Sequence, residues 1–129
     1  MILRLPKGSR KKIAKNFRAW EFDCHCSRCK ETLIDEKLIE ELQKLRDKLG
    51  LPVTIISGYR CNAHNRDVGG VPKSQHKLGR AADIVVYGLT PYEVWIDCKD
   101  FKGLGYYPTR GFVHVDVRSG RKARWRSFQ

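Results

Sequence analysis

Two short stretches of this sequence carry histidine and carboxylate side chains at spacings that suit metal chemistry. In the first, His76 and Asp83 lie on either side of a polar, glycine-containing turn that leads into an apolar, β-branched run. In the second, residues 111–118, polar side chains alternate with valines. Because successive side chains of a strand point to opposite faces, His114 and Asp116 share one face and the valines share the other. We therefore expect one face of this strand to be core and the other to carry chemistry.

Two imidazoles and one carboxylate on neighbouring strands suit a zinc ion with an open fourth position. The ligands would be His76, Asp83 and His114, which leave a net positive charge on the ion. Such an ion is a Lewis acid that lowers the pKa of water toward neutrality, as hydrolysis requires. A lone histidine is more often structural, so this prediction depends on the combination and on the glycine-flanked strand ends.

Hydrolysis of an amide also needs a base and a cation near the developing oxyanion. Asp116 is the predicted base because it shares a face with His114, and its rival role is to orient a ligand imidazole. Arg60, at the end of an apolar run, is the predicted cation. An arginine there either makes a structural ion pair or binds a substrate carboxylate, which its planar fork fits.

The cysteines form a second cluster in the sequence. Of the five, Cys24, Cys26 and Cys29 are closely spaced, and the odd total without a recognisable signal peptide argues against a disulfide framework. Close spacing suits a structural zinc ion, with Cys61 or His64 as the fourth ligand. The alternative is a set of reduced, partly buried cysteines without a metal, because the pattern lacks a second Cys-x-x-Cys pair.

The length and composition are those of a single domain with a hydrophobic core. The chain has 129 residues, 41% of them hydrophobic, and no apolar run long enough to span a bilayer. We expect residues 1–15 to form an extended basic leader and residues 16–129 to form the domain, with a basic tail over residues 119–129. The leader lacks the apolar core of a Sec signal peptide, so we expect synthesis in a cytoplasm.

The net charge of +12 predicts attraction to polyanions. Nucleic acid, anionic lipid, and the teichoic acids or peptide carboxylates of a cell wall all qualify, and charge alone does not choose among them. We do not expect specific recognition of nucleic acid, and we expect a monomer.

The elements that must position these residues follow from periodicity. Residues 35–49 have the clearest helical stripe, with Asp35 as cap and Gly50 as stop. The remaining expected elements are an aromatic cover at 16–22, a central strand at 52–57, short helices at 62–68 and 90–99, a strand at 82–87, and a glycine-aromatic turn at 103–108.

Together these motifs resemble a known family, the zinc D-Ala-D-Ala carboxypeptidases and their relatives. Those relatives include vancomycin-resistance D,D-dipeptidases, phage L-Ala-D-Glu endolysins and the hedgehog signalling domain. The motifs are Ser-x-His with a later Asp at residues 74–83, His-x-Asp at 114–116 and Ser-Gly-Tyr-Arg at 57–60. With the Gly-x-Gly-x-Tyr-Pro segment they extend the resemblance over about residues 16–125.

The resemblance implies a role for each matching residue. The implied zinc ligands are His76, Asp83 and His114. Arg60 would contact the substrate or its oxyanion, and Ser74 and Gln75 would line the site. One position departs from the family: several relatives carry a base three residues before the last ligand, where this chain has Gly111. Asp116 is therefore the predicted base by default.

The implied fold is a small single α+β domain, in which a central antiparallel sheet carries the zinc and helices pack on it. The implied function is hydrolysis of an amide bond in peptidoglycan stem peptides or cross-links by a zinc metallopeptidase. It would be a phage endolysin, released to the wall by a holin-type partner, or a wall-remodelling carboxypeptidase or endopeptidase. The alternative, motivated by Gly111, is a non-catalytic zinc-containing binding module of the same fold.

Overall fold

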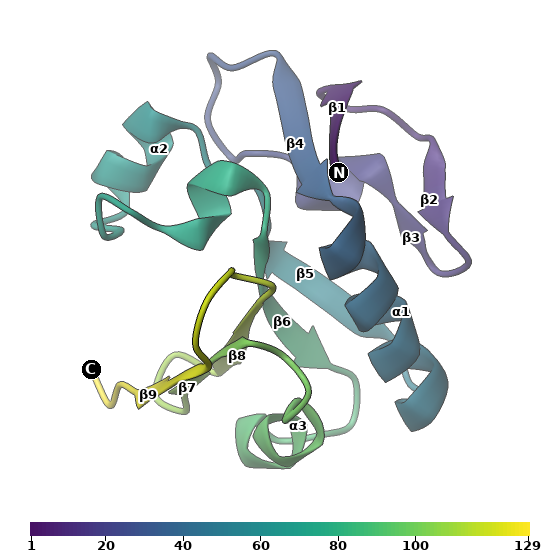
Figure 1. The fold of residues 1–129 in the computed structure, drawn as a ribbon, viewed down its shortest axis with the longest axis vertical. Coiled ribbons are helices and arrows are strands. Elements are labelled where there is room, and N and C mark those ends of the chain that lie inside the picture. The colour runs from purple at the N-terminus through teal and green to yellow at the C-terminus, as the bar shows by residue number, and fades with distance from the viewer.

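A computed structural model describes residues 1–129 as an α+β fold with nine strands and three α-helices (Figure 1). In chain order the elements are β1 (Ile2–Pro6), β2 (Lys12–Ala14), β3 (Phe17–Arg18), the 3-10 helix η1 (Ala19–Phe22), β4 (Glu31–Asp35), α1 (Glu36–Leu49), β5 (Val53–Ser57), α2 (Asn62–Asp67), the 3-10 helix η2 (Gln75–Leu78), β6 (Ala81–Val86), α3 (Pro91–Asp97), β7 (Gly103–Tyr107), β8 (Phe112–Asp116) and β9 (Ala123–Arg126). No helix here combines the length and the apolar character that a membrane crossing requires.

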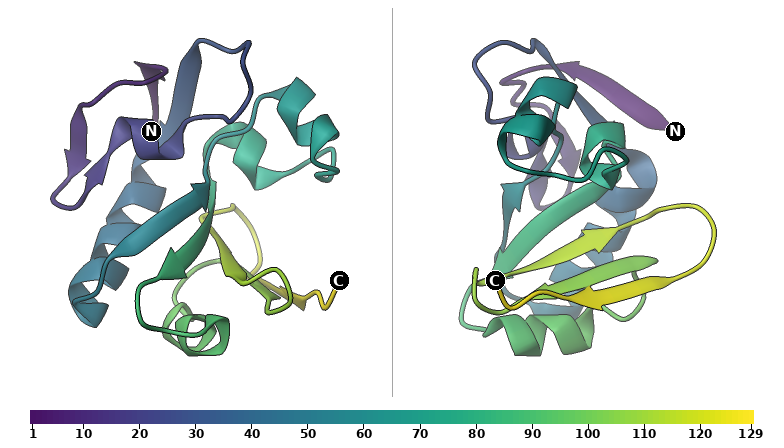
Figure 2. Two further views of the ribbon diagram at one scale, coloured as in Figure 1. Left: turned by 180° about the vertical axis from the view of Figure 1, so that it is seen from behind. Right: turned by 90° about the vertical axis from the view of Figure 1, so that its left-hand side faces the viewer.

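The main sheet has five strands in the order β5-β6-β8-β7-β9. The first four pair antiparallel, as predicted, whereas β9 runs parallel to β7. The sheet is therefore mixed rather than wholly antiparallel. The parallel strand comes from residues expected to form a basic tail, and it completes the sheet at the end of the molecule opposite β1 to β4 (Figure 2).

The two faces of β6 and β8 have different environments. One face is apolar and fully covered, and its buried residues are Ala82, Ile84, Val86, Val113 and Val115. These belong to one core cluster with buried residues of α1 and α3, so the helices pack on the apolar face. The opposite face presents Asp83 and His114, which stand directly across from each other in the β6–β8 register.

Helix α1 forms where the periodicity predicts it. The Asp35 side chain accepts a hydrogen bond from the Lys37 amide at 2.9 Å, and Gly50 ends the helix at a φ of 64°. A left-handed residue of this kind favours glycine because it has no Cβ. Leu38 and Leu42 are almost fully buried on the predicted stripe, so this helix is scaffold for the sheet.

The predicted leader is paired with the rest of the domain. β1 runs antiparallel to β4, and β2 pairs with β3. Leu3 and Leu5 are partly buried against the core, and this alternation was obscured in the sequence by the many basic neighbours. The predicted aromatic cover is confirmed in Phe17 and Phe22, whose rings are buried and 6.1 Å apart.

The predicted turn at residues 103–108 is a strand instead, β7. Its glycines are not turn residues, because they make room for side chains of neighbouring strands. A Cβ on Gly103 would overlap the carboxylate of Asp116, and one on Gly105 would lie 2.6 Å from the indole of Trp125. Glycine inside a strand often marks such a close approach.

The strand predicted to be central, β5, lies at the edge of the sheet. Its apolar run suggested burial on both faces, but Thr54 and Ile56 are exposed. The end of β5 nevertheless leads into residues 58–61, which reach the polar face of the sheet.

The tight fit at Gly103 yields a stability prediction. Gly103→Ala should lower the free energy of unfolding by about 1–3 kcal/mol, the usual range for an overpacked position, as measured by urea denaturation. The same substitution in an Asp116→Ala background should cost less, because the carboxylate that the methyl group would meet is gone. Equal costs in both backgrounds would contradict this account.

Candidate metal centre

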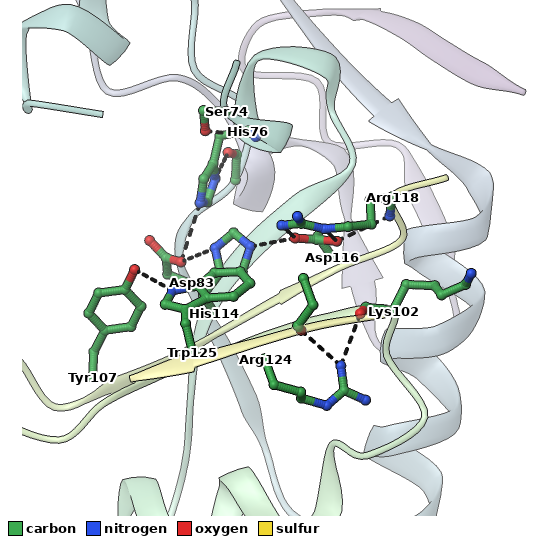
Figure 3. A network of polar contacts seen from close by, with 12 residues as sticks. Ser74, His76, Asp83, Lys102, Tyr107, His114, Asp116, Arg118, Arg124 and Trp125 are labelled. Carbon is green, nitrogen blue, oxygen red and sulfur yellow. Dashed lines mark hydrogen bonds and ion pairs between the residues drawn. The ribbon is translucent and has the colours of Figure 1, made fainter. Parts of the chain in front are cut away.

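Three buried side chains converge on the polar face of the sheet: His76, Asp83 and His114 (Figure 3). Asp83 and His114 come from the paired strands β6 and β8, and His76 comes from η2. The Asp83 Oδ1 lies 3.3 Å from His76 Nε2 and 3.1 Å from His114 Nδ1. One nitrogen or oxygen from each of the three lies within 4.8 Å of the others, close enough to share a single ion.

The loop before β6 places His76 by local hydrogen bonds. The Ser74 hydroxyl accepts a hydrogen bond from the His76 amide at 3.2 Å, which caps η2. Gly79, at a φ of 74°, ends η2 and packs on the backbone of Leu33. Ser74 is therefore part of the scaffold of the site as well as of its lining.

Each imidazole is held by a hydrogen bond on the edge that faces away from the centre. His76 Nδ1 donates to the carbonyl oxygen of Gly58 at 2.7 Å, and His114 Nε2 donates to Asp116 Oδ2 at 2.7 Å. The other ring nitrogens, His76 Nε2 and His114 Nδ1, both face Asp83. A histidine that ligates a metal through one ring nitrogen characteristically donates a hydrogen bond from the N–H of the other.

The charges of the site follow from burial and hydrogen bonding together. Burial alone would raise the pKa of Asp83, but hydrogen bonds from His114 and His76 outweigh it and hold that pKa below its usual range. Burial works to lower the pKa of His114, whereas its contacts with Asp116 and Asp83 raise it overall. Asp83 is thus an anion at neutral pH, as a metal ligand must be.

Asp116 lies behind His114, on the side away from Asp83. It is fully buried, and Arg118 binds it with two donors, Nε to Oδ1 at 2.9 Å and Nη2 to Oδ2 at 2.7 Å. Burial would raise the pKa of Asp116, but the hydrogen bonds from Arg118 and His114 hold it well below the usual range. This placement does not favour the predicted base and fits the alternative, in which Asp116 orients His114.

Arg60 contacts the second oxygen of Asp83. Its Nη2 lies 3.2 Å from Asp83 Oδ2, and its Nε donates to the Ser57 hydroxyl at 3.1 Å. The guanidinium is largely buried but also lines the cavity beside the site. Both predicted roles, the ion pair and the cation facing substrate, are thus compatible with its position.

A cavity of about 620 Å³ opens onto the three convergent residues. Its lining includes Ser74 and Gln75, as predicted, and the buried Gln75 Oε1 has no hydrogen-bond partner. Four cations also line it: Arg60, Lys73, Arg110 and Arg118. Asp83 is the one carboxylate among the lining residues, so the cavity is suited to an anionic ligand.

Two side chains that contact the site, Trp125 and Arg118, are not among the predicted site residues. Trp125 packs its ring 5.0 Å from that of His114 and donates Nε1–H to the Tyr107 hydroxyl at 2.8 Å. Arg118 lies over the same indole, 5.2 Å from its centroid. The alternation that placed His114 and Asp116 on one face also pointed to Arg118, whereas no local pattern connects Trp125 with the site.

The four predicted cysteine ligands form a separate group. Their sulfur atoms lie within 4.8 Å of one another, and Cys98 is buried elsewhere in the core.

The comparisons with known proteins identify the class of the chain. Residues 15–116 match the family model described as Peptidase M15, so the chain belongs to the peptidase M15 family. It is similar to the peptidoglycan L,D-endopeptidase MepK of Escherichia coli strain K12, with 34% identity over 97 residues. That alignment covers 68% of this chain and 53% of MepK.

A second relative is the probable peptidoglycan L,D-endopeptidase MepK of Haemophilus influenzae. It is 33% identical over 94 residues, which cover 65% of this chain and 50% of that protein. The chain spans about half the length of the curated relatives it matches.

The position of Asp116 yields a prediction that separates its two roles. If Asp116 orients His114, Asp116→Asn should weaken zinc binding by about ten- to a hundredfold, the usual effect of losing such a partner. Competition with a chromogenic chelator measures this affinity. The matched control is Asp97→Asn, at a surface carboxylate 3.6 Å from Lys48, which should leave affinity unchanged. Full zinc affinity with abolished hydrolysis would instead identify Asp116 as the base.

Proposed function

We propose that this chain is a zinc-dependent peptidase that hydrolyses peptidoglycan stem peptides or their cross-links, acting as an L,D-endopeptidase. The observation that carries the proposal is the convergence of His76, Asp83 and His114 beside a cavity. Membership of the peptidase M15 family supports the reaction class, and the similarity to MepK supports the choice of bond.

The donor set fits zinc. Two imidazoles and one carboxylate, each held from behind by a protein partner, match the ligands of catalytic zinc sites with an open position. When bound, zinc would supply Lewis-acid chemistry, polarising a carbonyl oxygen and lowering the pKa of water. The chain's own residues would do the positioning: Gly58 and Asp116 fix the two imidazoles, and Arg60 fixes Asp83.

The charge of the cavity supports a peptide substrate that carries free carboxylates. Arg60, Lys73 and Arg110 line the cavity without a second acidic side chain to neutralise them. Arginine binds carboxylates bidentately, and peptidoglycan stem peptides carry several carboxylates. Trp125, Tyr107 and Phe112 add an apolar wall on which the rest of the peptide can pack.

The net charge supports action at an anionic cell wall, because a basic protein is concentrated on polyanions by a long-range field. Release to the wall by a holin-type partner stays a prediction, as does the monomeric state.

Digestion of purified peptidoglycan tests the proposal. Mass spectrometry should find new termini on either side of an L,D bond after incubation with the wild-type protein. His114→Ala should lower the rate by more than about a hundredfold, since losing a ligand exceeds the loss of an outer partner. His25→Ala is the matched control, because His25 is exposed and does not line the cavity, and it should keep full activity.

Two results would contradict the proposed peptidase activity, and a third would correct only the proposed bond. Activity that survives His114→Ala would separate hydrolysis from this site. Tight zinc binding without cleavage of any stem peptide would favour the non-catalytic binding module instead. New termini at a D,D bond would keep the peptidase and correct the bond.

A further inference from the structure

Four cysteines that the proposed catalysis does not use gather at a second centre. Cys24, Cys26 and Cys29 lie in the loop between η1 and β4, and Cys61 precedes α2. Their sulfur atoms, from segments more than thirty residues apart, all lie within 4.8 Å of one another. All four are free thiols.

The spacing of these sulfur atoms is that of ligands around one ion. Cys24 and Cys61 Sγ are 3.8 Å apart, and Cys61 and Cys26 Sγ are 3.7 Å apart. A tetrahedral zinc with bonds of about 2.3 Å would set its sulfur ligands about 3.8 Å apart. The sulfur atoms of Cys26 and Cys29, at 3.2 Å, are well beyond the length of about 2.05 Å of a disulfide bond.

Hydrogen-bond donors surround the sulfur atoms of the cluster. Backbone amides donate to three of the sulfur atoms: Cys29 N to Cys26 at 3.3 Å, Cys61 N to Cys24 at 3.4 Å, and His64 N to Cys61 at 3.5 Å. The ammonium group of Lys7 lies 3.8 Å from both Cys26 Sγ and Cys29 Sγ, and it also donates to the Cys26 carbonyl. Four thiolates around a divalent ion carry a net negative charge, which this lysine offsets in part.

The geometry also decides between the two residues considered for the fourth position. Cys61 contributes its sulfur to the cluster, whereas His64 contributes its backbone amide. The His64 ring lies against that of His25, with centroids 6.2 Å apart.

We propose that Cys24, Cys26, Cys29 and Cys61 bind a structural zinc ion, distinct from the ion of the His–Asp–His centre. Four sulfur ligands close the coordination sphere and leave no position for a substrate, so this ion has a structural role. Metal binding by the cysteines does not depend on the proposed hydrolysis.

The cysteine cluster is connected to the His–Asp–His centre by residues 58–61. Cys61 is bound next to Arg60, whose guanidinium contacts Asp83 and whose amide donates to the His76 carbonyl at 3.1 Å. Gly58 supplies the carbonyl that holds His76 Nδ1. The zinc ion would therefore fix the Cys61 end of a short segment that positions two of the three predicted catalytic ligands.

The same segment is packed against the N-terminal part of the chain. The Tyr59 amide donates to the Phe22 carbonyl at 2.9 Å, and a Cβ on Gly58 would lie 2.8 Å from Phe22 Cα. Cys24 follows Phe22 by two residues, so the cluster joins the N-terminal strands to the residues behind the catalytic centre.

Metal analysis of the 129-residue chain, purified under reducing conditions, tests the proposal. We expect two zinc ions per wild-type chain, one in His114→Ala and one in Cys61→Ser. Replacement of zinc by cobalt in the His114→Ala protein should give intense sulfur-to-cobalt charge-transfer bands, which a His–Asp–His site cannot produce. Cys98→Ala is the matched control, because Cys98 lies in the core apart from the cluster, and it should keep both ions.

The positioning role has its own readout. Cys61→Ser should lower hydrolysis by about tenfold or more, as the loss of an outer partner does, while keeping the zinc of the other centre. If Cys61→Ser fails to fold, the cobalt spectrum of His114→Ala decides alone. One zinc per wild-type chain, with no thiolate bands, would overturn the proposal, as would disulfides found by mass spectrometry of the native protein. Either result leaves the proposed hydrolysis standing, whereas two zinc ions without cleavage would remove only the hydrolysis.

Discussion

The structure depends on the accommodation of one buried carboxylate, Asp83. An ionised carboxylate inside a protein costs several kcal/mol unless it is paired and hydrogen-bonded. Here His76 and His114 face one oxygen of Asp83, and Arg60 contacts the other. The register of β6 on β8, the capped turn of η2 and the end of β5 are the elements that bring these three partners together. The same grouping that satisfies the charge is also the one that can hold a metal.

The sequence was most informative where local residue patterns determine both the secondary structure and which side chains are buried. The alternation through His114 and Asp116 fixed which face of β8 is core, because a strand cannot bury an imidazole and a carboxylate among valines without partners. The cap of α1 was equally clear, since Asp35 satisfies a backbone amide that the helix itself leaves free. The α+β class followed from the family resemblance alone, whereas the set of three predicted ligands followed from the residues and was supported by that resemblance.

The sequence was least informative where the environment comes from distant residues. Gly103 and Gly105 suggested a turn because glycine is common in turns. Their actual role is to make room for Asp116 and Trp125, which becomes visible only when β7, β8 and β9 are paired. Strand β9 was interpreted as a tail for the same reason, since its partner β7 had not been recognised. Asp116 was predicted to be the base, with orientation of a ligand imidazole as the alternative, and its contact with His114 Nε2 fits the alternative.

The central claim is that one ion is bound by three atoms: His76 Nε2, His114 Nδ1 and a carboxylate oxygen of Asp83. An anomalous difference map, collected at the zinc absorption edge from crystals grown with zinc, tests it most directly. The account predicts a peak about 2.0–2.2 Å from His76 Nε2, His114 Nδ1 and an oxygen of Asp83, the usual zinc bond lengths. The absence of a peak among these three residues, or a peak bound to His114 through Nε2, would contradict it.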